Sequence, residues 1–361
     1  MADLLSEMAG VLLTFVPLLV VMLLANLAEQ RREQGRPHKA VAGLAYALTY
    51  VTFFGWLIFG VAVQAVSTAR KMNPAFFDQL DLAQIGANPF PIDSWLLLGF
   101  GVWLPALLGI LLLLPPIRKQ IARLLPIDPA SPVHAVALSW TMLVVINMTF
   151  TLGIGLGNLA ESLQTDEAGG GIGASTMALV WAQQLLTALL AIVGVGWLTR
   201  RTWTSAMVRL GIVRPTGRQV LIGLGWGLAM VPMIFVLEAM ATLLGLGIDA
   251  DVEALTEELL GPLFSSPLGI ITLGVAAAIG EETLLRGAVQ PRFGLVLTAL
   301  VFALLHSNYG ITISTLFVLL LGFVLGYLRN RHNTSTAMIT HAVYNMTLGL
   351  IAWLGASMLD L

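Results

Sequence analysis

Residues 268–290 read LGIITLGVAAAIGEETLLRGAVQ. This run is long enough to cross a membrane, because about 20 helical residues span a hydrocarbon core of roughly 30 Å. It nevertheless carries Glu281, Glu282 and Arg286 inside its apolar limits. A charged side chain at the centre of a membrane helix costs about 2.5–3.5 kcal/mol on insertion scales, so such residues mark a functional site or a specific partner. The stretch therefore predicts a membrane helix that contains a polar site.

The composition places most of the chain in lipid. Of the 361 residues, 57% are hydrophobic and 11% are charged, whereas about a quarter of the residues in soluble proteins are charged. Backbone groups in lipid must be satisfied within helices, and no segment has the alternating pattern of a barrel strand. We expect an all-α, polytopic transmembrane helix bundle with about ten helices. The approximate spans are 9–28, 41–66, 95–115, 135–159, 176–198, 219–246, 268–290, 295–309, 311–328 and 334–357, the eighth of which is short.

The loops between these spans alternate in charge. Clusters of Arg and Lys lie at 31–39, 118–123, 200–218, 292 and 329–331, and only Arg70 and Lys71 break the pattern. Acidic residues occupy two of the intervening loops, with Glu161, Asp166 and Glu167 in one and five more over 249–258. The positive-inside rule then predicts a multi-pass protein of the cell membrane with both termini outside the cytoplasm. The basic cytoplasmic loop 199–218 would separate N-terminal helices of unknown role (1–198) from the helix bundle (219–357) that carries the candidate site residues discussed next.

Charged residues within the last five spans suggest chemistry. Glu282 and Arg286 are four residues apart, so they share a helix face and can form an ion pair. Glu281 is rotated by about 100° from Glu282 and can face a cavity, where it is a candidate general base. The alternative for this motif is a set of ordinary charges at an interfacial helix end.

Two further motifs follow on later helices. Phe302 and His306 are four residues apart, as are His341 and Asn345. A ring N–H and a carboxamide on one face suit the binding of a developing oxyanion. The alternatives are a histidine that only packs and a polar pair that only joins helices. Because Glu281, His306 and His341 all lie roughly 12–18 Å from the basic ends of their spans, we expect them to converge.

The chain resembles the CPBP family of CAAX prenyl endopeptidases and bacteriocin-processing or immunity proteins over roughly residues 215–355. The resemblance rests on three motifs taken together: EExxxR (Glu281, Glu282, Arg286), FxxxH (Phe302, His306) and HxxxN (His341, Asn345). The resemblance implies an intramembrane glutamate protease. In that family, the equivalents of Glu281 and His306 would activate a water molecule, and those of His341 and Asn345 would stabilise the oxyanion. Glu282 and Arg286 would form a supporting ion pair.

The partners expected on this basis are a peptide or lipidated-protein substrate and membrane lipids. The net charge of −2 gives no reason to expect nucleic acid. No cofactor is expected, and metal-free catalysis is favoured over a zinc site because the spacing is not HExxH. The alternative functions are a non-catalytic membrane scaffold or immunity protein of the same family, and a transporter or proton relay that would also use Glu238.

Overall fold

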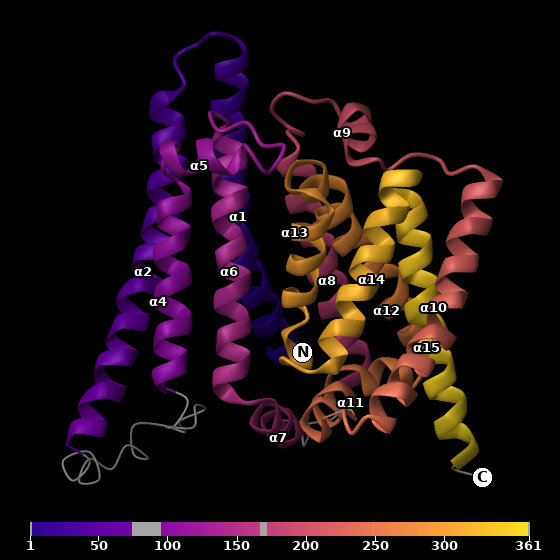
Figure 1. Ribbon diagram of the computed structural model, residues 1–361. Coiled ribbons are helices and arrows are strands. Elements are labelled where there is room, and N and C mark those ends of the chain that lie inside the picture. Colours follow the sequence, from indigo (N-terminus) through magenta and orange to yellow (C-terminus); the bar gives the residue numbers. More distant parts are fainter. Residues whose placement is uncertain (1, 74–94, 167–171, 248, 360–361) are drawn as a thin grey trace.

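The computed structural model describes residues 2–73, 95–166, 172–247 and 249–359, and this part of the chain is helical, with no strand. It confirms the prediction of an all-α polytopic bundle. The N-terminal helices lie on one side in Figure 1 and the C-terminal helices on the other. The helices are α1 (Ala2–Glu33), α2 (Lys39–Met72), α4 (Trp95–Leu112), α5 (Pro115–Ile121), α6 (Pro132–Ile154), α7 (Leu156–Asp166), α8 (Ile172–Gly194), α9 (Trp203–Leu210), α10 (Gly217–Leu243), α11 (Ala250–Phe264), α12 (Pro267–Glu282), η4 (Thr283–Val289), α13 (Gln290–Leu305), η5 (Ser307–Tyr309), α14 (Ile313–Arg331) and α15 (Thr334–Leu359).

Within the described residues, eight helical segments are long and apolar enough to span a membrane, and α4 with α5, bent by 92°, adds a ninth candidate. One of the eight, Pro267–Leu305, contains the predicted span 268–290 and all but the last four residues of the span 295–309. The guanidinium carbon of Arg286 lies 4.4 Å from the ring centroid of Phe302, although 16 residues of straight helix would separate them by about 24 Å. The chain therefore turns back between them. The turn lies at Gly294, whose φ of 76° favours glycine.

Some element limits differ from the sequence prediction. The helix that follows the turn at Gly294 ends at Leu305 and not at 309, so His306 is the C-cap of α13 instead of lying inside the helix. The chain then continues through the short turn η5 before α14 begins. The two predicted acidic loops are largely helical, because α7 and α11 occupy them, and Glu167 lies outside the described residues. Short amphipathic helices of this kind escape a search for long apolar runs.

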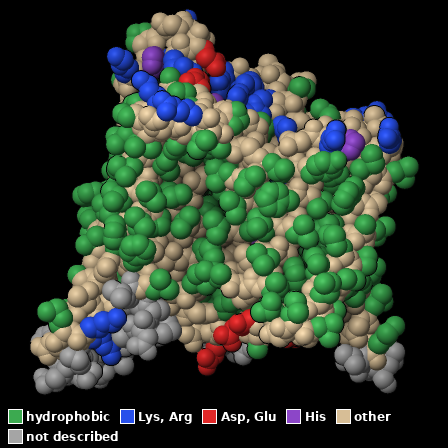
Figure 2. Space-filling model, in the orientation of Figure 1, with side chains coloured by type: hydrophobic (Ala, Val, Ile, Leu, Met, Phe, Trp, Pro, Cys, Tyr) green, Lys and Arg blue, Asp and Glu red, His purple; other side chains and the backbone are tan. Residues whose placement is uncertain are grey.

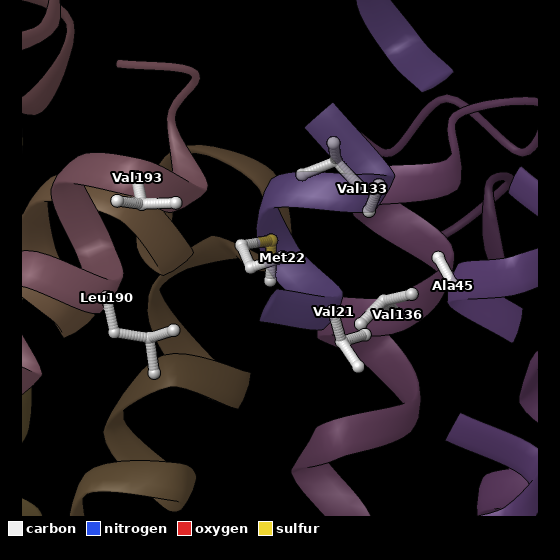
Figure 3. Packing of buried hydrophobic residues seen from close by; sticks show 8 residues of the cluster. Val21, Met22, Ala45, Val133, Val136, Leu190 and Val193 are labelled. Carbon is white, nitrogen blue, oxygen red and sulfur yellow. The ribbon is translucent and has the colours of Figure 1, made fainter. Parts of the chain in front are cut away.

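One apolar core of the N-terminal half gathers around helix α1. Val21 and Met22 of α1 pack against residues of α2, α6 and α8, including Ala45, Val136 and Leu190 (Figure 3). The buried carboxamide of Asn26 also donates to the carbonyl oxygens of the last turn of α8, at 3.0 and 3.1 Å. These contacts fix the end of α8 against α1.

The C-terminal half has its own apolar core, to which α10, η4, α13, α14 and α15 contribute. Helices α10 and α15 approach closely along Gly223 and Gly227, where an added Cβ would lie 2.8 and 2.7 Å from the side chains of Ile339 and Val343. The Thr340 hydroxyl donates to the Gly223 carbonyl at 3.2 Å. These glycines, which are spaced as GxxxG, therefore serve helix packing within one bundle.

The two ends of the bundle differ in charge. Most Arg and Lys side chains on the face shown in Figure 2 lie at one end, around α5 and α9, with a few acidic side chains among them. A patch of Asp and Glu lies at the opposite end, where the last turn of α2 also carries Arg70 and Lys71. A belt of hydrophobic side chains separates the two ends, as expected for a protein surrounded by lipid. We refer to them below as the basic end and the acidic end.

Candidate active site

The first part of the site comes from the junction of α12 and η4. A π-helix begins at Thr283, directly after the two glutamates, and such wider turns are common at functional sites. Glu282 Oε2 lies 3.2 Å from Arg286 Nε, and both side chains are fully buried. Arg286 also donates through Nη2 to the carbonyl oxygen of Gly322 on α14, at 3.3 Å. The ion pair predicted from the spacing is thus present, and it links this helix to α14.

His341 joins this pair from α15. Its Nδ1 lies 2.9 Å from Glu282 Oε1, and its side chain is 3% exposed. A carboxylate accepts hydrogen bonds, so Nδ1 donates and only Nε2 remains for another partner. Glu282 therefore has a cation on one oxygen and an imidazole on the other, which compensates its burial.

Glu281 and His306 form the second part of the site. Glu281 Oε2 lies 3.9 Å from His306 Nε2, and the side chains are 20% and 26% exposed. His306 Nδ1 donates to the carbonyl oxygen of Phe302 at 2.8 Å, which leaves the lone pair of the neutral ring on Nε2. The accessible pair therefore differs sharply from the enclosed Glu282, Arg286 and His341.

Phe302 is the wall between the two parts. Its ring lies under the Arg286 guanidinium, and its centroid is 4.6 Å from that of His306 and 6.0 Å from that of His341. The side chain has no exposed surface. Phe302 thus packs against all three polar groups and fixes their separation.

Two residues that the sequence did not single out complete the surroundings. Gln184 of α8 donates through Nε2 to Glu281 Oε1 at 3.1 Å. The ring of Tyr309 lies nearly parallel to that of His306, with centroids 6.2 Å apart. The adjacent glutamines 183 and 184 inside an apolar span were a signal for the first of these residues, since a polar side chain there needs a partner.

Helix α8 reaches Glu281 because Gly280 lets it approach. A Cβ on Gly280 would lie 2.7 Å from the carbonyl oxygen and 2.9 Å from the Cα of Gln184. The last N-terminal helix therefore packs directly on the helix that carries the glutamates. The small residue before the glutamates thus admits a neighbouring helix.

Asn345 and Glu238 are placed differently. Asn345 follows His341 by one turn of α15 and is half-buried, and its side chain makes no hydrogen bond to any residue that the structure describes. Glu238 lies on α10 close to the acidic end of that helix. The structure thus brings together Glu281, Glu282, Arg286, His306 and His341, leaves Asn345 beside them, and gives Glu238 no contact with the described members of this group.

Chemically, the accessible pair can hold a water molecule. A water oxygen can lie about 2.8 Å from both Glu281 Oε2 and His306 Nε2, and Oε2 has no hydrogen-bond partner among the described residues. Among all residues that the structure describes, no three His, Asp or Glu side chains are grouped so that they could hold a metal ion. The arrangement is suited to general base chemistry on a bound water.

Comparison with known proteins identifies the C-terminal part. Residues 263–347 match the family model described as type II CAAX prenyl endopeptidase Rce1-like. The matched segment contains all three motifs, and the predicted CPBP family is thereby confirmed for this segment. The family points to a membrane protease in general. No curated protein and no solved structure matches the chain.

Proposed function

We propose, from the CPBP membership of residues 263–347, that this chain is an intramembrane endopeptidase that cleaves a membrane-associated or lipidated peptide with a water activated by Glu281 and His306. The observation that carries the proposal is the contrast in exposure. Five ionisable groups lie together, but only the side chains of Glu281 and His306 keep substantial exposed surface, while Glu281 Oε2 itself is buried beside His306 Nε2. A purely structural cluster would have no reason to leave these two acid–base groups open and facing each other.

The reaction follows from the position of the atoms. The Glu281 carboxylate accepts a proton as the water oxygen bonds to the peptide carbonyl carbon, while His306 Nε2 holds the second hydrogen of that water. The tetrahedral intermediate then collapses, the C–N bond breaks, and the leaving nitrogen takes the proton from Glu281. No metal or cofactor takes part in these steps.

The surrounding residues have supporting roles in this proposal. Arg286 keeps Glu282 ionised, and Glu282 holds His341 through Nδ1. The carboxamide of Asn345 donates to the oxyanion, and His341 Nε2 donates as well when its ring is protonated. The predicted orientation would place the basic end in the cytoplasm, with both termini outside, so that the site lies nearer the cytoplasmic surface.

Substrate trapping tests the proposal. Glu281→Gln removes the base but retains an acceptor for Gln184, and we expect it to capture a peptide that the wild-type protein cleaves. Loss of a general base costs typically 10²–10⁴-fold in rate, so Glu281→Gln and His306→Ala should lower cleavage of the captured peptide by at least about a hundredfold. Glu238→Gln, which changes a membrane carboxylate elsewhere in the same half, is the control and should cleave normally.

The experiment separates an enzyme from a scaffold. Equal cleavage by the wild-type protein and by Glu281→Gln would reject the peptidase. Phenotypes that survive both substitutions would instead favour the non-catalytic member of the family. Insertion and folding of each variant are checked by size-exclusion chromatography in detergent.

A further inference from the structure

A cavity separate from the candidate active site lies between the two halves of the protein, at the basic end. The cavity has a volume of about 390 Å³. Helices α1, α6 and α8 form one wall, and η4 and α13 form the other. Most of its depth is apolar, and Trp140, Val144, Leu190, Val301 and Leu305 are among the lining residues.

The mouth of this cavity has an excess of positive charge. Five arginines and three carboxylates line it, so at least two positive charges are not neutralised there. Arg32 is paired with Glu29 and Asp128 at 2.5 and 2.6 Å, and Arg200 is paired with Glu33 at 2.7 Å. All three carboxylates therefore form ion pairs with Arg32 or Arg200. His134 accepts a hydrogen bond from the Asp128 N–H through Nδ1.

Three arginines at the mouth, Arg201, Arg209 and Arg292, have no ion pair with an acid among the described residues. Arg201 donates to the Val195 carbonyl and Arg209 to the Gly287 carbonyl. The Nε of Arg292 is buried without a hydrogen-bond partner in the described part of the chain. Burial and the charge of Arg292 lower the pKa of Arg209 to about 10, as expected where like charges are held together.

We infer that this cavity binds an anionic membrane lipid, with its phosphate between Arg201, Arg209 and Arg292 and one hydrocarbon chain in the apolar depth. Guanidinium groups bind phosphate oxygens in a geometry that fits them well. Clusters of basic residues at a membrane surface attract anionic lipids, at about 1 kcal/mol per residue. A soluble phosphate compound would leave the apolar depth unfilled, and a zwitterionic lipid would bring no net charge to balance the arginines.

The site lies apart from the proposed catalytic pair, and binding of lipid does not require peptidase activity. The two are joined by α8, which lines the cavity with Leu190 and Ala191 and contacts Glu281 through Gln184 two turns away. Leu305, one of the apolar residues that line the cavity, is next to His306 in the chain. A lipid held there would brace the α8 wall of the active site.

Quenching of Trp140 fluorescence by brominated lipids tests this inference. Purified full-length protein in detergent is titrated with phosphatidylglycerol and with phosphatidylcholine that carry the same brominated chains. The part of the quenching that Trp140→Phe removes reports a chain in the cavity. We expect half-maximal quenching of that part at a concentration at least about tenfold lower for phosphatidylglycerol, since 1.4 kcal/mol is a factor of ten in affinity.

Two charge variants locate the headgroup. Changing Arg201, Arg209 and Arg292 together to Gln should abolish the preference for phosphatidylglycerol. The matched control changes the exposed Arg214, Arg218 and Arg331 at the same end to Gln and should keep it, because the net charge falls equally. Equal loss in the two variants would mean that only overall charge attracts the lipid, and the inference would be wrong.

Two further arms keep the test decisive if the arginine variant does not fold. Ala137→Trp places a large side chain in the cavity and should remove the Trp140 signal for the lipid while the arginines remain. Inorganic phosphate at millimolar concentration should compete weakly. Equal quenching by the two lipids in the wild-type protein, full competition by inorganic phosphate, or displacement of the lipid by a peptide carboxylate would each overturn the lipid assignment.

Discussion

Replacing Arg286 by Met is the sharpest perturbation of the buried cluster. The change removes the only permanently charged group within ion-pair distance of the fully buried Glu282 among the described residues, as well as a donor to the Gly322 carbonyl. Methionine keeps the length and much of the volume of the side chain, so packing against Phe302 is largely retained. The remaining defect is a buried carboxylate that keeps only the hydrogen bond from His341.

Two different estimates of the loss in folding free energy could be applied to this substitution. Hydrogen bonds between membrane helices are worth about 0.6 kcal/mol on average, whereas breaking a buried ion pair by removing one partner costs about 3–5 kcal/mol. The second applies here because neither side chain has exposed surface. We therefore expect Arg286→Met to lower the free energy of unfolding by about 3–5 kcal/mol.

Unfolding in mixed micelles of dodecylmaltoside and sodium dodecyl sulfate, followed by circular dichroism, measures this loss. Adding Glu282→Gln to Arg286→Met should restore about 1 kcal/mol or more, since the amide removes the buried charge but still accepts from His341. Arg331→Met, on the exposed end of α14, is the control and should have little effect. A loss no larger than that of the control, or no recovery in the double variant, would refute the reasoning.

Three other predictions concern α8, the helix packing and metals. Gln184→Leu should lower peptidase activity by about tenfold with the fold retained, because one hydrogen bond of about 1.4 kcal/mol to Glu281 is lost. The same change at the exposed neighbour, Gln183→Leu, should have no effect, and equal rates for the two variants would contradict the prediction. Gly280→Val should destabilise the protein by about 1–3 kcal/mol, since its Cβ meets the Gln184 backbone, while Gly225→Ala, in open space, should be nearly neutral in the same unfolding assay. Peptidase activity should persist at full rate after dialysis against a strong chelator, and its restoration only by added zinc would disprove metal-free catalysis.

Much of the site could be predicted because it is local. The pairing of Glu282 with Arg286 follows from a spacing of four on one helix, and the different environment of Glu281 follows from its rotation on the same helix. The convergence of His306 and His341 on the glutamates followed from counting residues along each span. These inferences needed only helical geometry and the cost of charge in lipid.

The remaining features depend on contacts between distant segments. Nothing along the chain indicates that His341 would bind Glu282 through Nδ1 and so leave one nitrogen for an oxyanion. The contact of Gln184 with Glu281 was hidden for the same reason, because it crosses 97 positions and the basic loop. The limits of the short helices were also missed, since α7 and α11 lack the long apolar runs by which the other helices were found.

The reversal at Gly294 bears on how the protein enters the bilayer during synthesis. The arm from 295 to 305 is only about 16 Å long as a helix, roughly half of the hydrocarbon thickness. It cannot insert stably as an independent segment. We expect the translocation machinery to release residues 267–305 as one hairpin, with Arg292 retained at the basic end next to the turn, so that the half-length arm and the site at its tip are shielded from lipid from the start.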